Sequence, residues 1–296
     1  MSSEDIKQVR EMIASLPDWS TMDVLQMRAF YEQLGQQFPV PDGVSVEPTD
    51  VGGVKAEWVR APECRNDAVL LYVHGGGYVI GSLASHRHQV AALSQATGIA
   101  ALSLDYRCAP EHPFPAAVDD TVSAYQSLLA SGIAPNRIVV AGDSAGGGLT
   151  VATLLALRER GLPQAAAGVC ISPWVDLTMT AESYTTKAAV DPVVTREGVT
   201  GMSQAYLQGQ DAHTPLASPL FADLSGLPPL LIQVGTAEVL LDDSIKLEAN
   251  AKAAGVDVTL EVWDEMIHVW HFFYPMLSEG REAIARIGEF VRTQVK

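Results

Sequence analysis

From Ala68 to the end of the chain, short apolar runs alternate with longer segments that have the spacing of helices. The run AVLLYV (68–73) is continuously apolar, as is typical of a strand buried on both faces. Strands that alternate with helices predict an α/β fold, with a mostly parallel central sheet flanked by helices. Further strands are expected at IAALSLDY (99–106), RIVVAGDS (137–144), AAAGVCIS (165–172), PPLLIQVG (228–235) and VTLEVW (258–263). The functional site of such a sheet lies beyond the carboxyl ends of its strands.

Two regions stand outside this alternation. Residues 1–40 have helical spacing, and Pro17 is expected to separate two helices there. Residues 176–220 contain helical pieces and no strong strand. We therefore expect a main domain made of residues 41–175 and 221–296. Residues 1–40 and 176–220 would form a helical cap over its site.

Composition narrows the possible partners. The formal net charge of -16 argues against binding nucleic acid or an anionic membrane, because both need basic patches. The three cysteines are far apart, so neither a disulfide framework nor a zinc site is expected. No stretch approaches the roughly 18 apolar residues of a membrane span. The charged first residues lack the apolar core of a signal peptide, which favours a cytoplasmic location.

The strongest local motif is Gly142-Asp143-Ser144-Ala145-Gly146, which matches G-x-S-x-G. It follows the expected strand IVVA and opens an expected helix, and this context defines the nucleophile elbow of α/β hydrolases. The start of a helix also directs free N–H groups toward developing negative charge. We therefore expect Ser144 to be a nucleophile.

A glycine loop, His74-Gly75-Gly76-Gly77, comes directly after the strand AVLLYV. Loops of this HGGG type supply oxyanion donors in α/β hydrolases, together with the N–H of the residue after the nucleophile. The expected donors are Gly75, Gly76 and Ala145. We interpret His74 as a structural residue that holds the loop.

Three histidines follow Ser144 and could act as its general base. His268 lies just after the strand VTLEVW, where this fold places the base. His271 follows among large apolar residues and is expected to pack, and His213 lies in the expected cap. His268 is therefore the preferred base.

The acid of the triad is expected on the loop after PPLLIQVG. Glu238 is three residues past Gly235, and from there its carboxylate could orient His268 and stabilise the imidazolium. Asp242 and Asp243 remain alternatives, although both suit the start of the following helix.

The motifs HGGGYVIGS, YRCAPEHPFPAAVDD, GDSAGGG, SPWVDLT and MIH together resemble the bacterial hormone-sensitive-lipase-like (family IV) esterases. The resemblance spans residues 74 to 268. It implies hydrolysis of carboxylic esters with short acyl chains, no metal or cofactor, and a homodimer as a common assembly. It also implies that Tyr106, Arg107 and Glu111 brace the oxyanion loop. Glu238 stands where that family usually has aspartate.

These features together predict a serine carboxylesterase that acts on short- to medium-chain esters through an acyl-enzyme. Its expected partner is a small-molecule ester. An amidase or lactonase would use the same machinery, so these activities remain alternatives. A non-catalytic ligand-binding protein on this fold is a further alternative, which the presence of His268 disfavours.

Overall fold

The computed structural model describes residues 4–295, so the helical spacing expected at residues 1–3 lies outside the described part. Within it the chain forms an eight-stranded sheet in the order β1-β2-β4-β3-β5-β6-β7-β8. Only the pairings of β1 with β2 and of β2 with β4 are antiparallel. The strands are β1 (Ser45–Val51), β2 (Val54–Arg60), β3 (Arg65–Val73), β4 (Ile99–Leu104), β5 (Ile138–Asp143), β6 (Ala167–Ile171), β7 (Leu230–Gly235) and β8 (Val258–Trp263). The α/β prediction is confirmed, and the central strands consist of the apolar runs that the sequence indicates.

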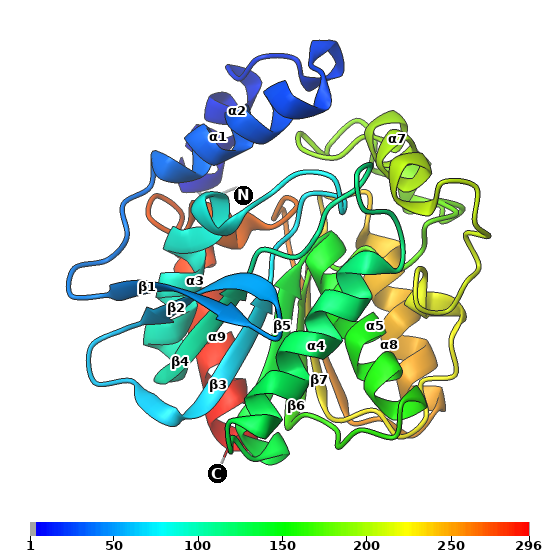
Figure 1. Cartoon of the computed structure of the whole chain (residues 1–296). Coiled ribbons are helices and arrows are strands. Elements are labelled where there is room, and N and C mark those ends of the chain that lie inside the picture. The colour runs from blue at the N-terminus through cyan, green and yellow to red at the C-terminus, as the bar shows by residue number, and fades with distance from the viewer. Residues whose placement is uncertain (1–3, 296) are drawn as a thin grey trace.

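Helices cover both faces of the sheet (Figure 1). The apolar cluster on one face includes side chains of α4 (Ala116–Ala130), α5 (Ala145–Glu159) and α8 (Leu241–Ala253). The cluster on the other face includes α3 (Leu83–Thr97) and α9 (Ser278–Gln294). Such double coverage explains why strands like β4 and β5 are buried along their whole length. No helix among residues 4–295 is long and apolar enough to cross a membrane.

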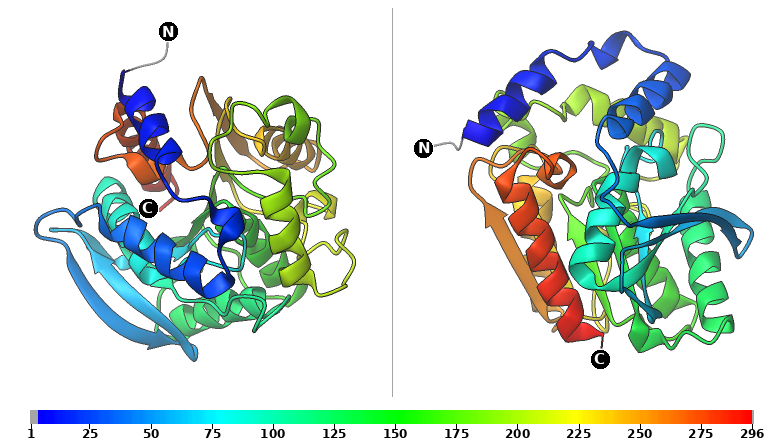
Figure 2. Two further views of the ribbon diagram at one scale, coloured as in Figure 1. Left: turned by 90° about the horizontal axis from the view of Figure 1, so that it is seen from above. Right: turned by 90° about the vertical axis from the view of Figure 1, so that its left-hand side faces the viewer.

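The remaining helices gather at the end of the molecule where the parallel strands finish (Figures 1 and 2). They are α1 (Glu4–Ala14), α2 (Val24–Gln36), α6 (Ser183–Thr186) and α7 (Arg196–Leu207). Short 3-10 turns lie at Trp19–Thr21, Pro135–Arg137, Pro219–Phe221 and Trp270–Phe273. Helix α2 begins with a capping box, in which the Asp23 carboxylate accepts the backbone N–H of Gln26 and the Gln26 side-chain oxygen accepts the backbone N–H of Asp23. The two regions outside the alternation therefore lie over the carboxyl ends of the strands.

Candidate active site

Ser144 occupies a sharp turn between β5 and α5. Its backbone has φ 54° and ψ −121°, a conformation that is costly for a residue with a side chain. The turn is held by its neighbours, because the Ser144 N–H donates to Ile171 O (2.8 Å) and the Trp174 N–H donates to Ser144 O (2.9 Å). Gly146 packs so close to the backbone of Val73 that a Cβ would collide with it. The geometry is that of a nucleophile elbow.

A histidine–carboxylate pair lies on the loops after β7 and β8. Nδ1 of His268 is 2.8 Å from Oε2 of Glu238, and the two side chains are only 6% and 0% exposed. The other carboxylate oxygen, Oε1, accepts from the Gly235 N–H (2.6 Å) and from the Ser172 hydroxyl (2.9 Å). Because Oε1 is already occupied by two donors, Oε2 is left to accept the Nδ1–H of His268.

Ser172 links the two loops and was not singled out from the sequence. It lies just after β6, its hydroxyl donates to Glu238, and its oxygen accepts the N–H of Val269 (3.1 Å). One buried hydroxyl thus fixes the acid and the residue that follows the base. The only sequence signal was its place in the SPWVDLT motif.

Ser144 and the pair come from strands β5, β7 and β8, whose carboxyl ends share one edge of the sheet. Within residues 4–295, no hydrogen bond joins Ser144 Oγ to His268. Contacts between a nucleophile and its general base are often loose without substrate and tighten in the complex. The arrangement therefore suits proton transfer from Ser144 to His268 once an ester substrate is bound.

The charges around His268 favour its protonated form. Burial opposes protonation, but the hydrogen bond and charge of Glu238 outweigh it, with smaller contributions from Asp191 and Asp143. The net effect raises the pKa of His268 above its ordinary value. For Glu238, burial raises the pKa, while His268 and the Gly235 N–H oppose the rise.

This shift predicts the pH dependence of catalysis. A general base must be neutral, so a raised pKa of His268 moves the acid limb of kcat/KM to higher pH. We expect kcat/KM to rise with pH through a midpoint above about 6.5, the ordinary value for histidine. Initial rates from about pH 5 to about pH 9 test this, and a flat profile would rule out His268 as the base.

The alternative bases and acids that the sequence offers have other partners in the structure. Burial lowers the pKa of His271 to about 3, and its Nε2 bonds to Gln233 Oε1 (2.6 Å), as suits a packing histidine. His213 is exposed and bonds to Asp211. Asp242 accepts the N–H of Ser183 (2.8 Å), and Asp243 accepts the N–H groups of Val175 and Asp176, each at 3.1 Å. No hydrogen bond joins Asp242 or Asp243 to His268 within the described chain.

The glycine loop after β3 differs from the expectation at one position. The N–H of Gly75 donates to Asp143 Oδ1 (3.0 Å), so the expectation that Gly75 is an oxyanion donor is wrong for this structure. The N–H groups of Gly76, Gly77 and Ala145 donate to no residue in the part of the chain described. Gly76 and Gly77 have φ of 109° and 62°, which glycine alone adopts freely and which turn the loop after Gly75.

The carboxylate of Asp143 organises the back of this loop. Besides Gly75, it accepts from the Tyr72 hydroxyl (2.5 Å) and lies 3.3 Å from His86 Nε2. Burial opposes its ionisation, but His86 and Tyr72 outweigh the burial and lower the pKa of Asp143 to about 2. Asp143 is therefore a buried anion that fixes the direction of the first glycine.

His74 contacts the glycine loop, in agreement with the structural role expected for it. Its Nδ1 lies 2.7 Å from Gly75 O, and its ring stacks on Tyr106 with centroids 4.3 Å apart. Burial lowers the pKa of His74 to about 3, so the ring is neutral and Nδ1 can donate to that carbonyl. The Tyr106 hydroxyl donates to His74 O (2.8 Å), as expected for a bracing residue.

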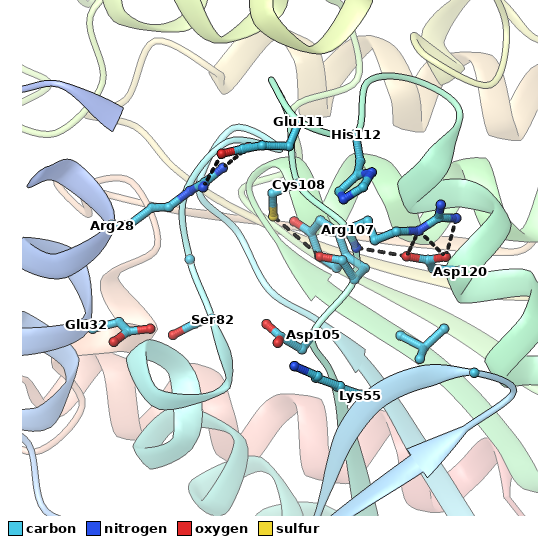
Figure 3. Close-up of a pocket in the computed structure, with 14 residues that line it drawn as sticks. Arg28, Glu32, Lys55, Ser82, Asp105, Arg107, Cys108, Glu111, His112 and Asp120 are labelled. Carbon is cyan, nitrogen blue, oxygen red and sulfur yellow. Dashed lines mark hydrogen bonds and ion pairs between the residues drawn. The ribbon is translucent and has the colours of Figure 1, made fainter. Parts of the chain in front are cut away.

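A pocket of about 580 Å³ is lined by residues that include Arg28, Lys55 and Asp105 (Figure 3). Neither His268 nor Glu238 is among its lining residues. Arg28 of α2 reaches its rim, where it pairs with Glu111 (2.7 Å) and donates to Val79 O and Ala109 O, both at 2.8 Å. Glu111 therefore braces the loop through Arg28, whereas Arg107 pairs with Asp120 (2.7 Å). Within residues 4–295, no group of three or more His, Cys, Asp or Glu side chains could hold a metal ion.

The chain is an α/β hydrolase, because the family model described as alpha/beta hydrolase fold matches residues 70–272. An acetyl-hydrolase of Streptomyces hygroscopicus is 49% identical, over 99% of this chain and 98% of that protein. An esterase of Acinetobacter venetianus is 35% identical, over 89% of this chain and 87% of that protein.

Solved structures narrow the family. A crystal structure of an esterase from the bacterial hormone-sensitive lipase family is 52% identical, covers all of both chains and has a TM-score of 0.97. The esterase EstE5, soaked with p-nitrophenyl butyrate, is 51% identical, covers 99% of both chains and has a TM-score of 0.95. The chain belongs to the hormone-sensitive-lipase-like esterases, as the motifs indicated.

Proposed function

We propose that Ser144, His268 and Glu238 form the catalytic triad of a carboxylesterase that acts on short- to medium-chain esters. The observation that supports this most is the hydrogen bond between Nδ1 of His268 and the buried carboxylate of Glu238. This pair lies at the same edge of the sheet as the strained Ser144. The chain is a carboxylic ester hydrolase, as its family and its esterase relatives indicate.

The reaction follows from the arrangement. Ser144 Oγ attacks the ester carbonyl while its proton moves to His268, whose imidazolium is stabilised by Glu238. The oxyanion is held by the N–H groups of Gly76, Gly77 and Ala145, and each such donor contributes about 3–4 kcal/mol of transition-state stabilisation. The ester C–O bond then breaks, and the alcohol leaves with the proton from His268. Water repeats the sequence on the acyl-enzyme and releases the acid and free Ser144.

Hydrolysis of p-nitrophenyl esters from acetyl to palmitoyl, beside the matched p-nitroanilides, tests the substrate class. We expect turnover of esters that falls with increasing chain length, and much slower turnover of the amides. The acetyl-hydrolase name of the Streptomyces relative supports the short-chain preference. Comparable rates for amides would contradict an esterase and favour an amidase.

We also propose that residues 1–40 and 176–220 form a cap that limits acyl-chain length. Their helices lie over the sheet edge, and Met202 of α7 packs against Gly77 of the glycine loop. The main domain is then residues 41–175 and 221–296.

Deletion of residues 1–37 tests the cap. It removes Arg28 and so releases the carbonyls of Val79 and Ala109 beside the glycine loop. We expect kcat to fall by about tenfold or more, because the oxyanion donors lose their fixed position, and relative rates across chain lengths to change. Unchanged relative rates would contradict a role in specificity.

A further inference from the structure

The turn at Val190–Asp191 lies where the 176–220 segment meets both loops of the proposed triad. Asp191 is buried, with only 7% of the residue exposed. Its Oδ1 accepts the N–H groups of Val193 (2.9 Å) and Val194 (3.0 Å), which closes a local turn. Its Oδ2 accepts the N–H of Val239 (2.8 Å), the residue directly after Glu238 and 48 positions away in the sequence. One carboxylate thus binds its own turn and the acid loop.

The same turn is connected to the base loop through Arg10 of α1. One guanidinium nitrogen of Arg10 donates to Val190 O (2.9 Å), and another donates to Glu265 O (3.3 Å). Glu265 lies three residues before His268 and has a positive φ of 62°. The turn therefore contacts the acid loop directly and the base loop through one arginine.

The charge of Asp191 also acts on the base. The groups around His268 are Glu238 after β7, Asp191 from the 176–220 segment, Asp143 at the end of β5, and His271 after β8. Burial lowers the pKa of His271 to about 3, so that ring is neutral near pH 7. The three carboxylates favour the imidazolium form of His268, the form that develops as Ser144 gives up its proton.

We propose that Asp191 is a positioning residue of the esterase reaction, which fixes the loop carrying Glu238 and adds negative charge that favours the imidazolium of His268. This inference rests on the proposed triad. A residue that only capped its own turn would need one acceptor oxygen, whereas the second oxygen of Asp191 satisfies a backbone donor beside the acid.

Asp191→Asn separates these roles. The amide oxygen can still cap the local turn, but the amide NH₂ then faces the Val239 N–H, donor against donor, and the charge is lost. Asp211→Asn is the matched control. Asp211 lies in the same segment and accepts a local N–H from His213 (2.9 Å), but it is exposed and has no bond to either triad loop.

The measurement is kcat and KM for p-nitrophenyl butyrate from about pH 5 to about pH 9, per active site counted with a covalent serine reagent. For Asp191→Asn we expect kcat per site to fall roughly 10- to 100-fold with little change in KM, because the reacting groups lose alignment. The acid limb of kcat/KM should move to lower pH, because one carboxylate near His268 is gone. Asp211→Asn should match wild type.

A wild-type kcat per site with an unmoved acid limb would overturn the proposal, even if fewer sites were titrated because the variant is less stable. If Asp191→Asn does not fold, Asp191→Glu is measured instead. It keeps the charge but displaces the hydrogen bonds, so a lower kcat with an unmoved limb is expected and a wild-type kcat would overturn the proposal. Wild-type protein without ester turnover would overturn the proposed function, and this inference with it.

Discussion

Ser144→Ala is expected to lower kcat for ester hydrolysis by roughly 10⁵- to 10⁶-fold. The backbone of Ser144 has φ 54° in the elbow, where its hydroxyl supplies the attacking oxygen. Alanine can keep this backbone conformation, but it lacks that oxygen. Steady-state hydrolysis of p-nitrophenyl butyrate measures the loss, and thermal unfolding shows whether the fold is retained.

Ser123→Ala is the matched control. Ser123 is a serine of α4 whose hydroxyl donates to Gly52 O (2.7 Å) on the surface, away from the elbow. The activity of the Ser123→Ala variant should equal that of wild type. If Ser144→Ala retained substantial turnover while Ser123→Ala behaved like wild type, another residue would have to be the nucleophile.

Glu238→Gln is expected to lower kcat by about 10³- to 10⁴-fold through the tautomer of His268. The Oε1 position must accept from the Gly235 N–H and the Ser172 hydroxyl, so the amide oxygen of glutamine occupies it. The amide NH₂ then faces Nδ1 of His268 and forces this nitrogen to accept. The ring proton moves to Nε2, which can no longer take the proton of Ser144.

Asp242→Asn distinguishes this account from a triad built on the other candidate acid. Asp242 contacts the N–H of Ser183 and not His268, so its variant should keep kcat within a few-fold of wild type. A large loss in Asp242→Asn together with mild behaviour of Glu238→Gln would assign the acid to Asp242 instead.

The fold and the main candidates were predictable because they depend on local pattern and topology. Short apolar runs such as 68–73, which alternate with helical segments, are typical of strands buried between two helical layers. A parallel sheet then brings the loops after its strands to one edge. Ser144, Glu238 and His268 follow from their positions after β5, β7 and β8. Their catalytic roles stay predictions until activity is measured.

The sequence could not predict contacts between distant segments. The direction of the Gly75 N–H depends on the Asp143 carboxylate 68 residues later. Ser172 contacts Glu238 and Val269 at separations of 66 and 97 residues. Asp191 carries no sequence signal, because its partner Val239 is 48 positions away and is reached only after the chain has folded. Each is a backbone or polar contact that leaves no periodic pattern.

Ester hydrolysis by this protein is expected to proceed through an acyl group on Ser144. Its most direct test is to quench the wild-type protein during turnover of p-nitrophenyl butyrate and to locate the acyl group by mass spectrometry. One butyryl group per chain is expected on the peptide containing Ser144, and none in the Ser144→Ala variant. A butyryl group on another residue, or rapid turnover in the Ser144→Ala variant, would contradict it.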